Sequence, residues 1–390
     1  MPTCDEKIVY PYTVSIFPSI HATNKENWTS SPVLFKQYDF LQKTIEANPH
    51  LDYKIVEIKE NNELIAQLFF QVVQFEGNEL KSYLPENKNF LGKAFKSFVD
   101  CALQKVNWSL AVLGNIFITG ENGQYWKKEV DAAKKWEIIS EVTKQLADNE
   151  NVDAFLISEI YREDWEAADI FISKKFRPFD VEPDMILDLD SEWLVFEDYL
   201  ASFSSKYRVR CKKVLKNSKG ITARLLSAND IKENGGKIHQ LYGNVMQSID
   251  FKLACVSPNY HYDIKSAFPS QYEVVGFFQE DELVGFVSFF DNPNVLDIHL
   301  IGLDYNLNKN LKIYQRILYD LVRYGIERKK AKVHFGRTAS IIKSTVGAKP
   351  IKVKSFIKHN DRISNIVIKP LTTYLKPEPF IARNPFKEKK

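Results

Sequence analysis

Residues 295–352 constrain the fold more than any other part of the chain. They begin with a strand-like run at 295–302 and continue with an amphipathic pattern typical of a helix at about 310–329. A second short β-type run follows at 332–336, and Thr338–Gly347 reads as a short helix between a capping threonine and a terminating glycine. A strand, a helix and a further strand in this order predict a crossover connection between parallel strands. The sequence therefore predicts an α/β fold with mixed sheets.

A crossover of this kind sets the N-terminus of a helix beside the carboxyl end of a strand. Backbone N–H groups at a helix N-terminus lack partners within the helix and carry partial positive charge, so an anion can bind there. Arg337, Thr338 and Lys343 follow the end of the second strand, with no acidic residue between them. We expect these residues to contact a carboxylate or phosphate of a substrate, and simple helix caps are the alternative.

The rest of the chain alternates in the same way and divides into two halves. The first half predicts strands at 53–60, 64–75, 109–118, 153–157 and 185–189, and helices at 31–47, 90–103, 126–146 and 165–174. The second predicts one helix from 196 to about 219, helices at 231–246 and 260–268, strands at 221–226, 272–278 and 283–290, and a closing hairpin at 351–358 and 363–368. We expect domains at 1–193, as a scaffold and substrate wall, and at 194–370, as the catalytic part, with an extended tail at 371–390.

Charge separates the same two halves. The chain of 390 residues has a net charge of +3, but residues 1–193 hold 20 Lys/Arg against 32 Asp/Glu, and residues 194–390 hold 33 against 18. Opposite charges either help the halves dock on each other or give the second half an anionic ligand. The four cysteines are scattered, no run approaches the roughly 20 apolar residues of a membrane span, and residues 1–10 are not typical of a signal peptide. We expect a cytoplasmic protein.

The most basic segment joins the two halves. Residues 206–219 contain no acid and hold Lys206, Arg208, Arg210, Lys212, Lys213, Lys216 and Lys219. Like charges along a helix repel one another, and an anionic partner relieves that repulsion. The candidates are CoA phosphates, a tRNA backbone and an anionic membrane surface, which would make the protein membrane-peripheral. A plain solvated helix face is the alternative.

Several motifs together resemble one known family. The element order of the second half, with the sequences KYRVRCKK (206–213), IGLDY (301–305), HFGRTASIIKSTVGAKP (334–350) and LAVLGNIFITGENG (110–123), is similar to that of GNAT N-acyltransferases. More specifically it resembles a Fem-like, BioF-associated group of two-domain bacterial proteins. The likeness spans about residues 30–360 and implies two tandem GNAT-like domains.

The resemblance also implies an acyl donor. Acetyl-CoA or another acyl-CoA would be the co-substrate, with no metal, and the matching positions are Ile301, Gly302, Leu303, Asn308, Lys309, Asn310 and Lys312. The family usually carries a Gln/Arg-x-x-Gly-x-Gly/Ala loop that wraps a pyrophosphate, whereas residues 307–312 of this chain contain no glycine. Fem-type transferases, which take aminoacyl-tRNA as donor, also depart from that loop.

Transfer of an acyl group from a thioester to an amine needs a base, a polarised carbonyl and an acid for the leaving thiol. His299, beside Asp297 on one face of the predicted strand, is our candidate base, and Tyr314 is the candidate acid. A core histidine and an ordinary packing tyrosine are the alternatives, and we interpret His334 as a strand residue. No catalytic triad, metal-ligand set or glycine-rich nucleotide motif is visible.

We therefore predict an N-acyltransferase that moves an acyl group from acyl-CoA, or from an acyl-carrier protein, to an amine in a ternary complex. An aminoacyl-tRNA-dependent transferase of the Fem type is the enzyme alternative. A non-catalytic binding protein that retains the fold is the alternative from another class. A donor that binds should raise the melting temperature, which distinguishes the three.

Overall fold

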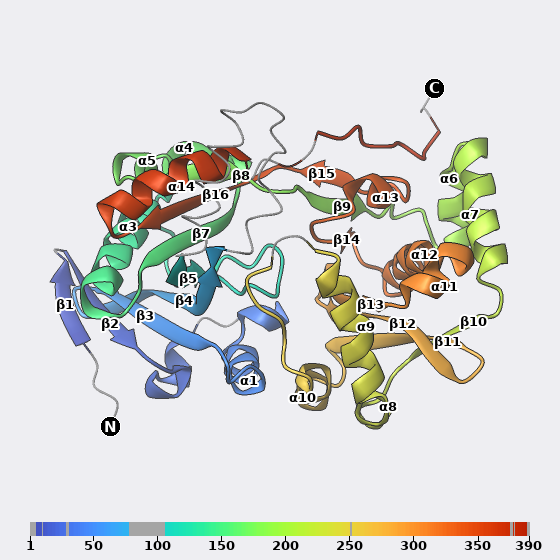
Figure 1. The fold of residues 1–390 in the computed structure, drawn as a ribbon, viewed down its shortest axis with the longest axis horizontal. Helices are drawn as coiled ribbons and strands as arrows, with labels where there is room; N and C mark the ends of the chain where they lie inside the picture. Colours follow the sequence, from blue (N-terminus) through green and yellow to red (C-terminus); the bar gives the residue numbers. More distant parts are fainter. Residues whose placement is uncertain are drawn as a thin grey trace, which may run out of the picture.

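The computed structural model describes residues 5–9, 11–28, 31–77, 106–249, 252–374, 377 and 379–387. They form two mixed sheets that lie side by side, with helices packed on both (Figure 1). This confirms the predicted α/β class. The helix predicted at 90–103 lies outside the described residues.

The first sheet has the strand order β1-β2-β3-β4-β5-β7-β16-β8, and β6 pairs with β4. Its strands are Asp5–Val9 (β1), Tyr12–Phe17 (β2), Asp52–Glu60 (β3), Glu63–Glu76 (β4), Asn107–Leu113 (β5), Gln124–Trp126 (β6), Ala154–Tyr161 (β7), Arg177–Asp180 (β8) and Val353–His359 (β16). Strands β5 and β7 are parallel, as the predicted crossover in this half requires. Both faces of β4 are buried: Phe69 and Val73 pack into one core cluster, while Leu68 and Phe70 pack into another.

The second sheet has the order β10-β11-β12-β13-β14-β9-β15. Its strands are Asp184–Asp188 (β9), Ile221–Leu225 (β10), Tyr272–Gln279 (β11), Glu282–Asp291 (β12), Val295–Leu303 (β13), Lys332–His334 (β14) and Lys349–Ile351 (β15). Strands β13 and β14 are parallel, so the predicted crossover at 295–336 is confirmed. Its connection consists of two helices, α11 (Tyr305–Leu311) and α12 (Ile313–Glu327), rather than one.

The remaining helices begin and end close to the predicted positions, with some corrections. They are α1 (Tyr38–Ala47), α3 (Ala132–Asn149), α4 (Trp165–Ala168), α5 (Ile170–Ser173), α6 (Phe196–Ser202), α7 (Ser205–Asn217), α8 (Ala228–Glu233), α9 (Gly235–Gln247), α10 (Tyr260–Ala267), α13 (Ser340–Ser344) and α14 (Arg362–Tyr374). The helix predicted at 126–146 starts later because its first residue belongs to β6, and Asp131 caps α3. The single helix predicted from 196 is broken at Phe203, which is extended and bridges to Phe386.

The two halves exchange strands. Strand β9, from the first half, lies between β14 and β15 in the second sheet, and β16, from the second half, lies between β7 and β8 in the first. The predicted closing hairpin is therefore wrong: 353–359 pairs across the molecule and 363–368 belongs to helix α14. Residues 371–374 also continue α14, so the predicted tail does not begin at 371. A domain boundary at residue 193 stays a prediction. Strand β9 lies before this residue and joins the second sheet, and β16 lies after it and joins the first.

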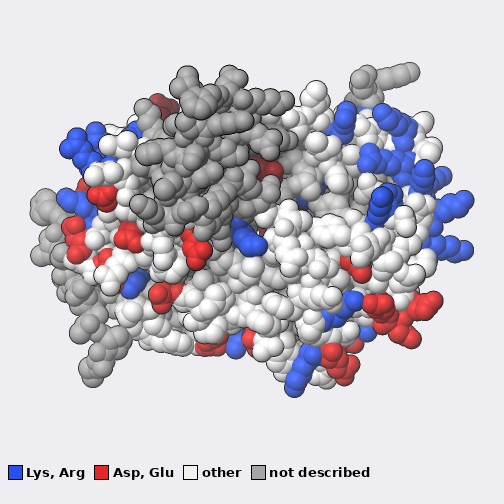
Figure 2. All heavy atoms as spheres, in the orientation of Figure 1, with Lys and Arg blue, Asp and Glu red and all other residues white. Residues whose placement is uncertain are grey.

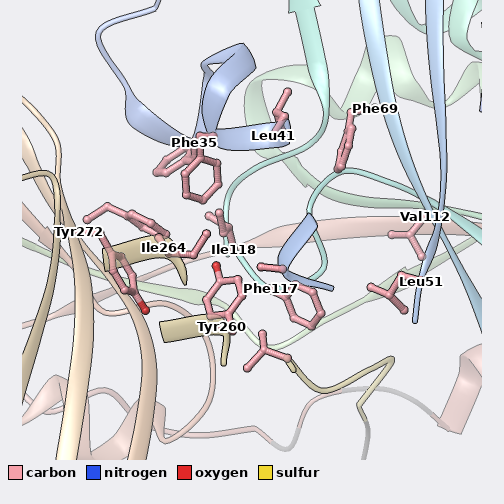
Figure 3. Packing of buried hydrophobic residues seen from close by; sticks show 14 of the residues in the cluster. Phe35, Leu41, Leu51, Phe69, Val112, Phe117, Ile118, Tyr260, Ile264 and Tyr272 are labelled. Carbon is pink, nitrogen blue, oxygen red and sulfur yellow. The ribbon is translucent and has the colours of Figure 1, made fainter. Parts of the chain in front are cut away.

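One core cluster extends across both halves and holds them together. Phe35, Phe69 and Phe117 from the first half pack in the same buried cluster as Tyr260 and Tyr272 from the second (Figure 3). The backbone N–H of Leu34 also donates to the side-chain oxygen of Asn292 over 2.9 Å. Burial of apolar surface stabilises such contacts by roughly 25 cal/mol for each Å². The relative orientation of the sheets is therefore fixed by packing.

Candidate functional site

The central feature of the second sheet is the point where β13 and β14 part. Three residue pairs join them, ending at Asp297 with His334, and β14 stops there. Residues 298–303 of β13 continue with partners on the β12 side alone, among the residues that the structure describes. A bulge near Ser288 accompanies the parting, and the Ser288 hydroxyl accepts the N–H of Leu300 over 3.1 Å. Bulges re-aim side chains, and this one lies where β13 loses one neighbour.

A buried ionic network closes the parting point. His334 Nδ1 lies 3.1 Å from Asp297 Oδ1, and its Nε2 lies 3.5 Å from Asp184 Oδ2. The Asn292 amide donates to the other Asp297 oxygen over 2.8 Å, and the Tyr161 hydroxyl donates to Asp184 over 2.5 Å. Burial alone would lower the pKa of His334, but the two carboxylates outweigh it and raise the pKa to about 9. The imidazole is therefore a cation at neutral pH.

A second ion pair lies next to this network. Arg337 is 3.0 Å from Glu159, whose carboxylate also accepts the N–H of Gly120. Glu159 has a left-handed backbone, with φ of 60°, in the strand region that pairs with β16. A non-glycine residue in this conformation stores roughly 1–3 kcal/mol of strain, a feature that concentrates at functional sites. Burial raises the pKa of Glu159 and Arg337 opposes it.

The predicted anion-binding residues after β14 are used internally. Lys343 is buried, and its ammonium donates to the carbonyls of Phe335, Gly336 and Arg337 over 2.7, 3.2 and 2.5 Å. Burial lowers its pKa to about 7. These contacts hold together a loop with several left-handed residues, so we correct the expectation that Lys343 faces a substrate anion. Thr338 is exposed and left-handed, and the helix N-cap is Ala339 rather than Thr338.

The predicted donor-site residues lie at the other end of the parting. Ile301, Gly302 and Leu303 form the end of β13, and Asn308, Lys309 and Asn310 lie in α11, which replaces the expected loop. The Asn308 side chain accepts the backbone N–H of Tyr314 over 2.9 Å, so a residue of the chain already caps the start of α12. Lys312 is left-handed between the helices and donates to the carbonyl of Lys309. The tight cradle that glycines would provide is therefore absent from residues 305–314.

The two predicted catalytic side chains on β13 do not meet. Asp297 contacts His334 and Asn292, whereas His299 Nε2 lies 3.0 Å from the Tyr260 hydroxyl and its ring packs 4.8 Å from Phe290. Asp297 therefore does not orient His299.

The His299 imidazole is nevertheless neutral. Burial, and to a smaller extent the neighbouring His261, lower the pKa of His299 well below its ordinary value. Its Nδ1 is buried, and a backbone hydrogen bond with Phe117 partly opposes the lowering of the pKa.

Tyr314, the predicted acid, is partly buried at the start of α12. Burial raises the pKa of its hydroxyl, and nearby Tyr305 raises it further. The hydroxyl is therefore protonated at neutral pH, as a proton donor must be.

The basic segment forms an exposed ridge. The side chains of Lys206, Arg210, Lys212, Lys213, Lys216 and Lys219 are exposed on α7 and at its end, and they gather at one edge of the molecule (Figure 2). Arg208 differs, because its guanidinium donates to the carbonyl of Phe203 over 3.0 Å. The helix packs against α11 and α12, next to the predicted donor site.

Sequence reasoning missed part of this site. Asp184, Glu159 and Tyr161 were not predicted, and His334 was interpreted as a plain strand residue. The available signal was the presence of ionisable residues in short strands that are otherwise apolar, since burying such groups costs free energy unless they are paired. The structure describes no group of His, Cys, Asp and Glu placed to hold a metal ion.

Two tandem units, each with a parallel crossover in a mixed sheet, define the class of the fold as tandem GNAT-like. The structure is similar to that of FemX, with 11% identity, a TM-score of 0.53, and coverage of 88% of this chain and 97% of that chain. It is also similar to the tandem GNAT protein from the clavulanic acid biosynthesis pathway, with 10% identity, a TM-score of 0.51, and coverage of 89% and 98%. No family model and no curated protein matches the sequence. These likenesses confirm the predicted fold. Among the described residues, no helix is long and apolar enough to span a bilayer.

Proposed function

We propose that the chain is an N-acyltransferase that moves an acyl group from a thioester donor to an amine. The observation that carries the proposal is the parting of β13 from β14, with a neutral histidine on the freed part of β13. FemX and the tandem GNAT protein share the fold, and acyl transfer is the activity that the name GNAT denotes. The donor would lie along residues 298–303, with its thioester near His299.

The proposed reaction is one direct displacement. The amine nitrogen attacks the thioester carbonyl carbon, a C–N bond forms, and the C–S bond breaks. The His299 imidazole takes a proton from the amine nitrogen as the C–N bond forms, and the Tyr314 hydroxyl protonates the leaving thiolate. His334 is already protonated at neutral pH, so it does not serve as the base. It instead fixes the parting point through its two carboxylates.

A binding screen and a thiol-release assay test the proposal. Acetyl-CoA and decanoyl-CoA should raise the melting temperature, and free thiol should appear when a panel of amino acids and amino sugars is added. His299→Gln should lower turnover by roughly 10²–10⁴-fold with donor binding unchanged, because a general base contributes about this much. His21→Gln, at an exposed position in the first half, is the matched control. If no thioester donor binds and no thiol is released, the proposal is wrong.

One observation favours a second donor. The start of α12 is capped by Asn308, so the pyrophosphate contact expected for CoA is weakened, and a basic ridge lies beside it. An aminoacyl-tRNA donor has no pyrophosphate and would use such a ridge. Charged tRNA belongs in the same screen, at low and at high salt.

A further inference from the structure

The basic ridge of α7 presents its charges to solvent. We define it as the exposed side chains of Lys206, Arg210, Lys212, Lys213, Lys216 and Lys219. In the described part of the chain none of them forms an ion pair with a carboxylate, although several other exposed lysines do. The first turn of α7 holds a lysine and no acid, which is the unfavourable arrangement for the helix dipole. The ridge therefore costs the folded chain free energy that an external partner can recover.

The shape of the ridge excludes a small anion as its main partner. Residues 206–219 span roughly 20 Å at the helical rise of about 1.5 Å per residue, several times the length of a pyrophosphate. In its first half lies Val209, a 66% exposed apolar side chain with Lys206, Lys212 and Lys213 one turn away. Apolar and charged side chains side by side are typical of protein–protein interfaces. The ridge offers little to stacked bases, since Tyr207 is partly buried and lies under Lys206.

The position of the ridge narrows the partner further. Helix α7 packs against α11 and α12, so the ridge borders the donor end of the parting between β13 and β14. The side-chain oxygen of Asn308 already accepts the backbone N–H of Tyr314, a donor at the start of α12 that would otherwise be free to bind a pyrophosphate. A donor that carries its thioester on a phosphopantetheine arm, attached to an acidic protein, needs no pyrophosphate contact and supplies carboxylates to the ridge.

We propose that the basic ridge of α7 docks an acidic acyl-carrier protein, which delivers the acyl thioester into the parting between β13 and β14. This inference rests on the proposed acyltransferase function and names its donor. The carboxylates of the carrier pair with the ridge, Val209 meets an apolar side chain, and the arm reaches past α11. Electrostatic attraction of this kind speeds association and falls with ionic strength.

Binding measurements on the full chain test the docking. We would measure the dissociation constant of a purified bacterial acyl-carrier protein loaded with a decanoyl group, in about 50 and about 300 mM salt. Decanoyl-CoA and a mixed tRNA sample serve as competing probes. Lys206→Gln/Arg210→Gln/Lys213→Gln should weaken carrier binding at least about tenfold at low salt and leave decanoyl-CoA binding unchanged. Lys127→Gln/Lys144→Gln/Lys352→Gln removes three exposed charges away from the ridge and should have no such effect.

The outcomes separate this inference from the function on which it rests. If decanoyl-CoA binds and the carrier does not, or if both triple variants bind the carrier equally, the docking proposal is overturned while the acyltransferase survives. If tRNA binds, the carrier does not, and tRNA binding is lost in the variant of the basic ridge, the docking proposal is overturned in favour of RNA. If neither thioester binds, the acyltransferase proposal falls first.

Discussion

Replacing His334 by glutamine should change how stability depends on pH. The imidazole lies between Asp184 and Asp297, and its pKa is raised to about 9 from an ordinary value of 6.5. A group whose pKa is higher in the folded state stabilises the protein fully below the unfolded pKa and loses this effect as pH rises through the folded pKa. The difference between the two pKa values corresponds to about 3 kcal/mol of stabilisation, at about 1.36 kcal/mol for each pKa unit.

The wild-type advantage over His334→Gln should therefore shrink by about 3 kcal/mol between pH 6 and about pH 9.5. Urea unfolding followed by tryptophan fluorescence gives the free energy of unfolding of both proteins at each pH. Lys343 titrates in both proteins, with a pKa that burial lowers to about 7, so the comparison uses the difference between the two curves. The His334 Cε1 proton should also titrate near 9 by NMR. Parallel stability curves, or titration near the ordinary value, would refute an imidazolium held by two carboxylates.

Three further substitutions test other parts of the structure. Burial lowers the pKa of His261 to about 3, so protonation of its ring in the unfolded chain should favour unfolding as the pH falls. The free energy of unfolding of wild type, relative to His261→Phe, should therefore fall by about 2 kcal/mol from pH 7.5 to pH 5. An unchanged difference would contradict a buried neutral ring. Gly302→Ala places a Cβ 2.2 Å from the Phe286 ring and should cost about 1–3 kcal/mol by urea unfolding, whereas Gly236→Ala, in open space, should not destabilise. Phe386→Ala removes a partly buried aromatic ring that packs against Tyr199 and Phe203, and it should lower the free energy of unfolding by about 2–3 kcal/mol. A variant as stable as wild type would mean that this contact contributes little.

The crossover at 295–336 was predictable because its evidence is local. Apolar spacing defines a helix or a strand within a few turns, and a strand, a helix and a strand in sequence have few ways to pack. The hairpin predicted after residue 351 failed for the opposite reason. The pattern marks 353–359 as a strand, but the choice of β7 and β8 as its partners depends on residues about 200 positions away.

The same limit explains what was missed at the site. Asp297 and His299 are two residues apart, which predicts a shared face, but their partners come from distant segments. Asp297 meets His334 on the parallel strand, and His299 meets Tyr260 from helix α10. Asp184 joins the network because β9 crosses from the other half, and no local pattern shows that crossing. The role of Lys343 was misjudged since sequence shows its charge and not the carbonyls around it.

The strand exchange has a consequence for the making of the protein. Strand β8 pairs with β16 alone among the described strands, so residues 177–180 have no sheet partner until residues 354–357 have left the ribosome. Likewise β14 and β15 meet through β9, which is translated about 150 residues earlier. Contacts between such distant residues slow folding, because a long loop must close before they form. The second sheet has all its described strands once residue 351 has been made, whereas the first sheet still lacks β16 (Val353–His359). A ribosome that stops before residue 353 therefore releases a chain in which β7 and β8 lack the strand that joins them.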